Sequence, residues 1–258
     1  MNNKYFSLTN KTILVTGASA GIGAHAAELF AEHGAHVIAV ARTKEKLSAV
    51  AKAADKLSGT ISIEPFDLCE FDKIDSFVNH IINKYNHVDV LMNNAGLLLN
   101  KPYGEYTEQD FDDIFNLNIK ALFLLTQAMV RKMKLTGHGN IINIGSAADL
   151  FCFEKASIPY TLSKAAVTKL TQQLAIKLCK DNIRVNALCP GLFNTGVFDQ
   201  MPNRQEHIKK VEAIIPLHKV GDLNELNGAL LLLASDASSY MTGSILRVDG
   251  GMSINKQL

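Results

Sequence analysis

The chain of 258 residues lacks the features that mark several large classes of protein. It carries 26 Lys and Arg against 25 Asp and Glu, and therefore lacks the basic surplus expected of a nucleic-acid-binding protein. Its longest apolar runs, such as residues 229–234, are too short to cross a bilayer. The N-terminal segment has no apolar stretch of signal-peptide length. We therefore expect no nucleic-acid partner, no membrane segment and a cytoplasmic location.

Cysteine and histidine are present, but not in patterns that bind metals or form disulfide frameworks. The cysteines are widely spaced and include no CxxC pair, and the histidines form no HExxH motif. We interpret the thiols as reduced and predict no metal site. The four cysteines are Cys69, Cys152, Cys179 and Cys189.

Strand-like and helix-like segments alternate along the whole chain. Short β-branched runs are followed by helical stretches of ten or more residues, a pattern typical of a parallel sheet covered on both faces. With right-handed crossovers, this predicts a doubly wound α/β sheet of Rossmann type with about seven strands. We find no linker or repeat, and predict one domain over residues 1–258. The strands are predicted at residues 11–16, 36–41, 60–66, 88–93, 140–145, 183–188 and 244–249.

Two helical segments, residues 119–133 and 160–178, are apolar around more than one face. A helix on the surface of a monomer usually shows a single apolar stripe. We interpret the second face as a contact with another copy of the chain, in a homo-oligomer that is a dimer or tetramer. The alternative is a long helix packed under a loop of the same chain.

A glycine-rich turn follows the first predicted strand. Gly17, Gly21 and Gly23 stand between that strand and the next helix. Glycines at such a turn allow the backbone to approach a pyrophosphate, whose charge is stabilised by the positive end of the helix. A tight strand–helix turn without a ligand would look similar, but its place in a βαβ unit favours a dinucleotide site.

A tyrosine and a lysine with acid–base potential share one helix face. Tyr160 and Lys164 are four residues apart, and an ammonium group near a phenol lowers a phenol pKa that starts at about 10. Ser146 ends a predicted strand, at the edge where open α/β sheets bind ligands. Each feature also has a simpler interpretation. Tyr160 and Lys164 could be an exposed pair of residues on a helix, and Ser146 could be an ordinary helix cap or turn residue.

In combination, these motifs resemble the short-chain dehydrogenase/reductase family, in its branch of about 250 residues. The resemblance covers nearly the whole chain: TGxxxGIG at 16–23, NNAG at 93–96, YxxxK at 160–164, Pro-Gly at 190–191 and VDGG at 248–251. It implies the catalytic set Asn118, Ser146, Tyr160 and Lys164. It places cofactor contacts at Gly17, Ser19, Gly21, Ile22, Gly23, Arg42, Asp67, Leu68, Asn94, Gly96, Tyr160, Lys164, Pro190, Gly191, Phe193 and Thr195.

The resemblance also implies a mechanism. In reduction, Tyr160 donates a proton to the carbonyl oxygen as hydride arrives from nicotinamide, and Ser146 hydrogen-bonds that oxygen. Lys164 lowers the Tyr160 pKa and binds the nicotinamide ribose, while Asn118 positions a water in a proton relay. Intact catalytic positions favour an active oxidoreductase over the alternative of an idle, nucleotide-sensing Rossmann protein.

The end of the second strand predicts the cofactor. Ala41 stands where NAD-dependent relatives place an acidic residue, and Arg42 follows with a guanidinium suited to a 2′-phosphate. Ser19 could add a hydroxyl to the same phosphate. This favours NADP(H), with NAD(H) as the alternative. Arg42 could instead be a solvated residue or a partner of Glu45, and Asp67 could be a helix cap rather than an adenine contact.

The expected substrate is an apolar carbonyl compound, such as a 3-oxoacyl group, with sugar, polyol or steroid alcohols as alternatives. Apolar residues around the site support this prediction: Leu97, Leu98, Leu99, Leu150, Phe151, Phe153, Phe198 and Met201. A basic cluster, Arg131, Lys132 and Lys134, could receive an acidic carrier, or could be a solvated helix C-terminus. Ser146 and Tyr160 are one position further apart than is usual in the family, which could reshape the pocket or disturb the serine.

Overall fold

A computed structural model of the chain describes residues 4–150, 156–195 and 204–255. Its centre is a seven-stranded sheet of order β3-β2-β1-β4-β5-β6-β7, in which neighbouring strands are parallel. This confirms the predicted doubly wound sheet, and each predicted strand overlaps its observed counterpart. The strands are β1 (Thr12–Thr16), β2 (His36–Ala41), β3 (Thr60–Pro65), β4 (Val90–Asn93), β5 (Gly139–Ile144), β6 (Ile183–Pro190) and β7 (Ile245–Val248).

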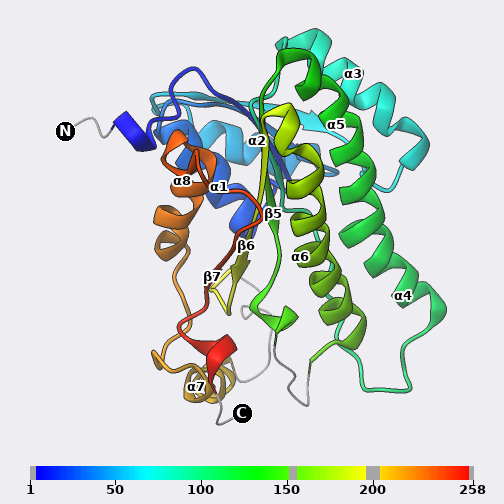
Figure 1. The fold of residues 1–258 in the computed structure, drawn as a ribbon. Coiled ribbons are helices and arrows are strands. Elements are labelled where there is room, and N and C mark those ends of the chain that lie inside the picture. The colour runs from blue at the N-terminus through cyan, green and yellow to red at the C-terminus, as the bar shows by residue number, and fades with distance from the viewer. Residues whose placement is uncertain (1–3, 151–155, 196–203, 256–258) are drawn as a thin grey trace.

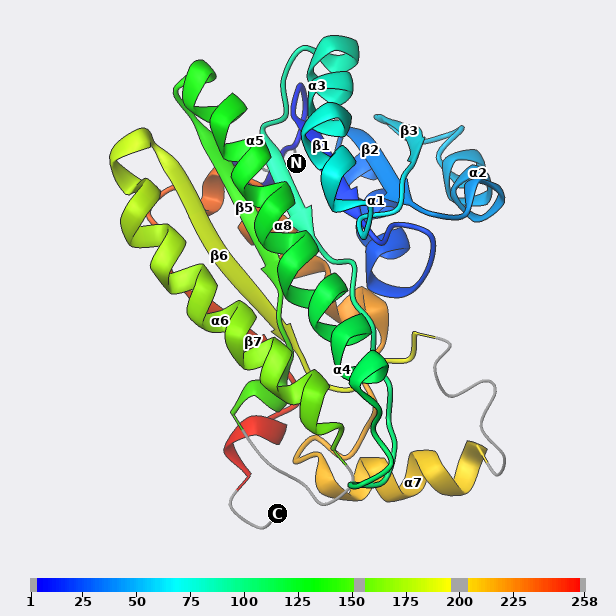
Figure 2. The same cartoon turned by 90° about the vertical axis from the view of Figure 1, so that its right-hand side faces the viewer.

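Helices cover both faces of the sheet (Figures 1 and 2). One layer contains α1 (Gly21–Glu32), α2 (Lys44–Ala53) and α8 (Asn227–Ala234), and the other contains α3 (Ile74–Tyr85), α5 (Leu122–Thr136) and α6 (Ile158–Leu178). The helix α4 (Glu108–Phe115) leads into α5, and α7 (Arg204–Ile214) lies beyond the carboxyl edge of the sheet.

Two hydrophobic cores form because both faces of the sheet are buried. In β1, Ile13 and Val15 face the core under α1, whereas Leu14 faces the core under α3 and α5. A strand buried on both faces must be apolar at successive positions, which explains its continuous β-branched and aliphatic sequence.

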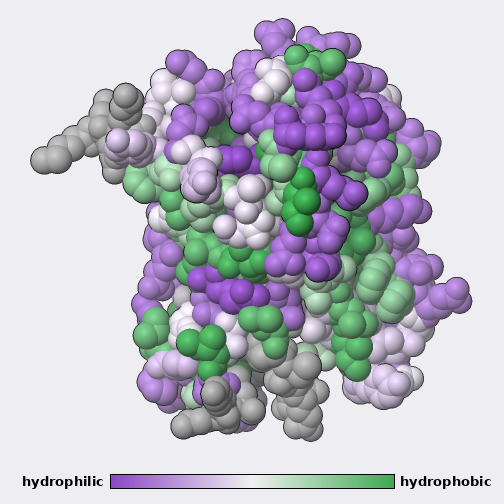
Figure 3. Space-filling view, viewed as in Figure 1, coloured by the Kyte–Doolittle hydropathy of each residue, from purple (hydrophilic) through white to green (hydrophobic). Residues whose placement is uncertain are grey.

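The outer face of α6 is not covered by the described part of the chain. Ile158, Leu162 and Ile176 on this helix are 46%, 51% and 74% exposed. Figure 3 shows apolar patches interrupting the polar surface over the layer that contains α4, α5 and α6. The exposed apolar face agrees with the pattern that led us to expect a contact with another copy. Among the described residues, no helix is long and apolar enough to span a membrane.

Candidate active site

The predicted site residues lie at the carboxyl edge of the sheet, around the point where the strand order reverses. The chain runs outward from β1 to β2 and β3, and then returns to β4 on the other side of β1. Parallel sheets bind ligands in the crevice that this reversal leaves. The glycine turn follows β1, the NNAG segment follows β4 and Ser146 follows β5.

The glycine turn leaves the N-terminus of α1 open to an anion. Gly17 has a φ of 65°, and a Cβ at Gly23 would lie 2.4 Å from the Gly17 carbonyl oxygen, so both positions require glycine. Within the described residues, no side chain caps the helix at Ala20, and its first turn contains no acidic residue. The free N–H groups and the helix dipole therefore fit the pyrophosphate of a dinucleotide.

Asn94 holds this turn in place. Its side-chain Nδ2 donates to the carbonyl oxygens of Thr16 at 2.9 Å and Gly17 at 3.2 Å, and its backbone N–H donates to the Thr16 hydroxyl at 3.0 Å. A contact between Asn94 and the cofactor stays a prediction. Its side-chain nitrogen already donates to the carbonyl oxygens of Thr16 and Gly17. The structure therefore gives Asn94 a supporting role that the sequence alone did not indicate.

Tyr160 and Lys164 lie on α6, as the helical spacing predicts. The Lys164 Nζ lies 5.6 Å from the centroid of the Tyr160 ring and donates to the carbonyl oxygen of Ile144, the last residue of β5, at 2.8 Å. The Ser146 hydroxyl, just beyond the same strand, hydrogen-bonds the Tyr160 hydroxyl. The end of β5 thus brings the serine, tyrosine and lysine into one constellation.

Asn118 joins this constellation from a π-helical segment, Asn116–Ala121, between α4 and α5. It is 1% exposed. Its Oδ1 accepts from the Leu97 N–H at 2.7 Å, and its Nδ2 donates to the Leu97 carbonyl at 3.0 Å and to the Ser163 hydroxyl at 2.9 Å. A Cβ at Gly96 would lie 3.4 Å from Asn118 Oδ1 and 3.5 Å from Lys164 Nζ, so both groups flank this glycine.

Burial governs the pKa values of the two acid–base groups. It lowers the pKa of Lys164 to about 8. It raises the pKa of Tyr160, and the hydrogen bond from Ser146 acts in the opposite direction. The prediction that Lys164 gives Tyr160 a lowered pKa is therefore wrong for the protein alone. The cause is that the tyrosine is taken out of water while the ammonium group is directed to the Ile144 carbonyl.

Comparison with known proteins identifies the family. A family model described as enoyl-(acyl carrier protein) reductase matches residues 17–253. The 3-oxoacyl-(acyl-carrier-protein) reductase of Thermotoga maritima is 36% identical over 247 residues, which cover 96% of this chain and 99% of the relative. The chain belongs to the short-chain dehydrogenase/reductase family. It is accordingly an NAD(P)-dependent oxidoreductase of an alcohol/ketone pair.

Two further members of the short-chain dehydrogenase/reductase family are named for gluconate chemistry and not for 3-oxoacyl groups. The 5-keto-D-gluconate 5-reductase of Escherichia coli is 34% identical over 250 residues, with 97% of this chain and 98% of the relative covered. The crystal structure of a gluconate 5-dehydrogenase from Burkholderia cenocepacia, in complex with NADP and tartrate, has a TM-score of 0.91. It is 29% identical in sequence, and the match covers 98% of each chain.

In this short-chain dehydrogenase/reductase, the residues expected at the adenosine end cluster at the ends of β2 and β3. Arg42 is exposed directly after β2. Burial and the Asp67 carboxylate raise the pKa of Cys69, while the charge of Arg42 acts against them, so Arg42 lies beside this turn. Asp67 Oδ1 accepts from the Cys69 N–H at 2.9 Å within the turn after β3, whereas the N-caps of the next two helical segments are Glu70 and Lys73, so Asp67 is not a helix cap. Leu68 is buried in the core.

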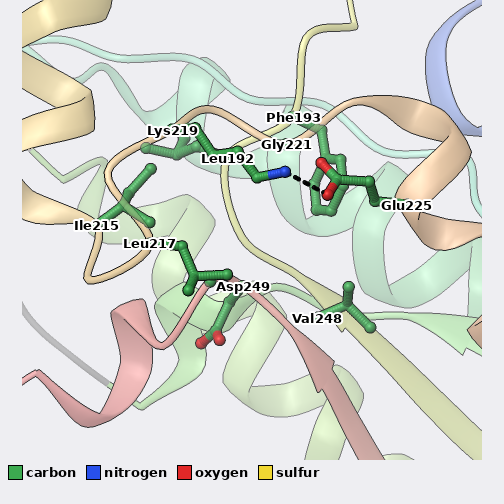
Figure 4. A pocket seen from close by; sticks show the side chains of 10 residues that line it. Leu192, Phe193, Ile215, Leu217, Lys219, Gly221, Glu225, Val248 and Asp249 are labelled. Atoms are coloured by element: carbon green, nitrogen blue, oxygen red, sulfur yellow. Dashed lines mark hydrogen bonds and ion pairs between the residues drawn. The ribbon is translucent and has the colours of Figure 1, made fainter.

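The segment after β6 returns to the glycine turn. A Cβ at Gly21 would lie 3.4 Å from the Thr195 Cβ, which places Thr195 over the turn, while Gly191 passes close to Asp249. The Phe193 ring packs against Gly221 in an apolar pocket that an ion pair between Lys219 and Glu225 borders (Figure 4). The Phe193 side chain therefore packs against Gly221 and holds the segment after β6 in place.

The remaining predicted cofactor residues lie in the glycine turn, at the start of α1 and at the end of β6. Ser19 is half-buried in the glycine turn, and Ile22 packs on the core at the start of α1. Pro190 is the last residue of β6. In the described residues no group of three or more His, Cys, Asp or Glu could hold a metal ion.

The residues expected around the substrate are only partly described. Leu98 and Leu150 are 52% and 58% exposed. Phe151, Phe153, Phe198 and Met201 lie outside the described residues. No sequence pattern points to Tyr106, whose hydroxyl donates to Ser157 Oγ at 3.1 Å and so ties the segment after β4 to the start of α6.

The basic cluster on α5 is remote from this crevice. Arg131 pairs with Asp75, and Lys134 pairs with Asp181 at 2.8 Å. The cluster ends α5 at the amino edge of the sheet, opposite the end that carries Ser146. This favours the interpretation as a helix C-terminus over a docking site for an acidic carrier.

Proposed function

We propose that the chain is an NADP(H)-dependent oxidoreductase of apolar ketones and secondary alcohols, with 3-oxoacyl groups as the first candidate substrate. The observation that supports this is the convergence of four polar groups at the end of β5. Asn118, Ser146, Tyr160 and Lys164 come from three separate segments of the chain; Asn118 and Lys164 flank Gly96, and Ser146 interacts with Tyr160 one turn of α6 away from Lys164. An idle nucleotide-binding domain would not require this convergence.

We infer one role for each group from this arrangement. The bound nicotinamide supplies the hydride, and the protein orients the substrate and handles the proton. The Ser146 hydroxyl donates to the substrate oxygen, and the Tyr160 hydroxyl gives that oxygen its proton. Lys164, with a pKa lowered to about 8 by burial, exchanges a proton readily near neutral pH and so can return one to Tyr160. Asn118 holds the segment beside Lys164 through which water would deliver that proton.

Preference for NADP(H) rests on the end of β2. Ala41 ends the strand without a carboxylate to repel a phosphate, and the exposed Arg42 follows it. A planar guanidinium forms charge-assisted hydrogen bonds with phosphate oxygens, and Ser19 lies in the glycine turn as a further donor. The related gluconate 5-dehydrogenase with bound NADP supports the same choice.

An apolar substrate is favoured by the exposed leucines after β4 and after Ser146, Leu98 and Leu150. A keto sugar acid is the second candidate, because two relatives are named for gluconate chemistry. The purified protein should be assayed with 3-oxoacyl thioesters, alicyclic and aromatic ketones, keto sugar acids and steroid alcohols, following nicotinamide absorbance with both cofactors. Turnover of sugar acids alone would favour the second candidate.

Tyr160→Phe tests the assignment of the proton donor. The substitution keeps the ring and removes the hydroxyl, so turnover should fall by roughly 10²–10⁴-fold while cofactor binding stays nearly intact. Tyr240→Phe is the matched control, since Tyr240 is fully exposed. Turnover near the wild-type value in Tyr160→Phe would show that another group donates the proton.

We also propose a homo-oligomer that covers the apolar outer face of α6, and a cytoplasmic location. The exposed Ile158, Leu162 and Ile176 support the first, because several exposed apolar residues along one helix often mark an interface. The free thiols of Cys69, Cys179 and Cys189 support the second.

A further inference from the structure

The turn directly after Ser146 determines where its hydroxyl points. Residues Ala147–Asp149 form a single 3₁₀ turn, η4, with Ser146 at its N-cap. The Ser146 Oγ accepts from the Ala148 N–H at 3.2 Å, and the Asp149 N–H donates to the Ser146 carbonyl at 3.2 Å. A shift of this turn would therefore move the serine hydroxyl with it.

Asp149 anchors the turn from its far end. Its side chain is 3% exposed, and both carboxylate oxygens lie 3.2 Å from Nη2 of Arg247 on β7. The hydroxyl of Thr168 on α6 lies 2.9 Å from Asp149 Oδ2 and also 2.9 Å from the carbonyl oxygen of Lys164. Asp149, Arg247 and Thr168 form what we call the carboxylate clamp.

The clamp joins β7 and α6 to the turn that follows β5. Arg247 is the register partner of Cys189 on β6, so both side chains point to the same face of the sheet. The Cys189 sulfur accepts from the Ser146 backbone N–H and would lie 2.5 Å from a Cβ at Gly145. The arginine thus reaches across β6 to hold the segment that follows β5.

Buried ion pairs seldom add net stability, because the desolvation of two charges offsets their attraction. Their directional bonds do restrict geometry, since a carboxylate held from two sides, by Arg247 and by Thr168, has little freedom to move. The segment from Ser146 to Tyr160 is one position longer than is usual in the family. An anchor three residues after Ser146 separates the serine from length changes further along that segment.

We propose that Asp149 is a positioning residue for Ser146 and that Arg247 and Thr168 hold it in that role. This inference rests on the proposed function, because it requires Ser146 to act on the substrate oxygen. The side chains of Asp149 and Arg247 bond to one another and to Thr168, and Thr168 meets the predicted cofactor residue Lys164 at its backbone carbonyl, not at the Nζ that would bind the ribose. Loss of the Asp149 carboxylate should therefore affect turnover and leave cofactor binding nearly unchanged.

The test is a double-mutant cycle on turnover of an acetoacetyl thioester or of the best ketone found. Asp149→Asn keeps the shape and removes the charge, and should lower kcat by about 10- to 100-fold, as expected when a reacting group is displaced by a fraction of an ångström to one ångström. The dissociation constant of NADPH, measured by fluorescence, should stay within about twofold of wild type. Asp236→Asn, which removes an exposed ion pair with Lys11 at the amino edge, is the control.

The decisive variant is Asp149→Asn in a Ser146→Ala background. If Asp149 acts through Ser146, the second substitution should change kcat by less than about twofold there. If the two effects multiply instead, the proposal is overturned. If Ser146→Ala alone leaves kcat unchanged, the proposed catalytic role of Ser146 is wrong. This result distinguishes a failure of the proposed function from a failure of the positioning role of Asp149 alone. If Asp149→Asn folds poorly, Thr168→Val is the alternative variant, because it removes one contact of the clamp. Its effect on kcat should likewise disappear in the Ser146→Ala background.

Discussion

Replacing Lys164 by methionine should stabilise the protein while abolishing its activity. The lysine is 5% exposed, and burial lowers its pKa from 10.5 to about 8. The folded state therefore disfavours the ammonium form that predominates at pH 7 in the unfolded chain. Methionine has a similar length and carries no charge, so it removes that penalty.

The magnitude follows from the pKa. A shift from 10.5 to about 8 corresponds to a penalty of about 3 kcal/mol at pH 7, at about 1.4 kcal/mol for each pKa unit. Against this, the Ile144 carbonyl loses the donor that now lies 2.8 Å away, which costs on the order of 1–2 kcal/mol. The free energy of unfolding should therefore rise by about 1–2 kcal/mol.

Urea unfolding at several pH values provides the assay. The folded state has the lower pKa, so wild type pays the full penalty below pH 8 and recovers it as the pH rises towards 10.5. The advantage of Lys164→Met should accordingly shrink over that range. Lys169→Met, an exposed position on the same helix, should change the free energy of unfolding by less than about 0.5 kcal/mol. A Lys164→Met protein less stable than wild type at pH 7, or a difference independent of pH, would refute the reasoning.

Three further predictions concern the cofactor, the edge of the sheet and the assembly. Arg42→Ala should weaken NADPH by about 1.5–3 kcal/mol, seen in its Michaelis constant, and leave NADH nearly unchanged; equal losses would show that Arg42 does not contact the 2′-phosphate. Burial alone would raise the pKa of Glu64, but hydrogen bonds from Lys84, Tyr85 and His80 outweigh it and lower the pKa. Glu64→Gln should therefore lose about 1–3 kcal/mol of stability at pH 7, and the loss should disappear as the pH falls through the lowered pKa, below 4.5; a difference that persists at pH 3 would contradict this. Light scattering at micromolar concentration should give a mass well above the 28.2 kDa of one chain, and a monomer would rule out the proposed oligomer.

The fold was predictable because both faces of the sheet are buried. The β-branched run of β1 has side chains in both cores, so its hydrophobicity is continuous and easily recognised. The ends of the strands were harder to predict than their centres, because they depend on pairing with a strand that is distant in the sequence. The strand β6 continues through Cys189 and Pro190 because both pair with β7, whereas the predicted strand stopped before them.

Contacts between distant segments determine the part of the site that the sequence could not show. The spacing of Tyr160 and Lys164 placed them on one face, but not the Ile144 carbonyl that directs the ammonium group. The π-helical segment around Asn118 has no recognisable sequence signal, since its residues also suit an α-helix. The ion pair of Asp149 and Arg247 joins residues 98 positions apart, which no local pattern reveals.

A chain of buried amides explains how α6 is held over the end of β5 despite its weakly patterned surface. Asn93 on β4 donates to Thr126 on α5 and to Asn143 on β5, both at 2.9 Å, and Asn143 in turn donates to Thr171 on α6 at 2.9 Å. Apolar side chains at these positions would allow the helix to slide, because hydrophobic contact has little directionality. A buried hydrogen bond permits one distance and one angle, and breaking it leaves an unsatisfied polar group. Since Thr171 lies two turns after Lys164 on the same helix, this connection fixes the height of Lys164 and Tyr160 above the sheet, and with it their distance from Ser146.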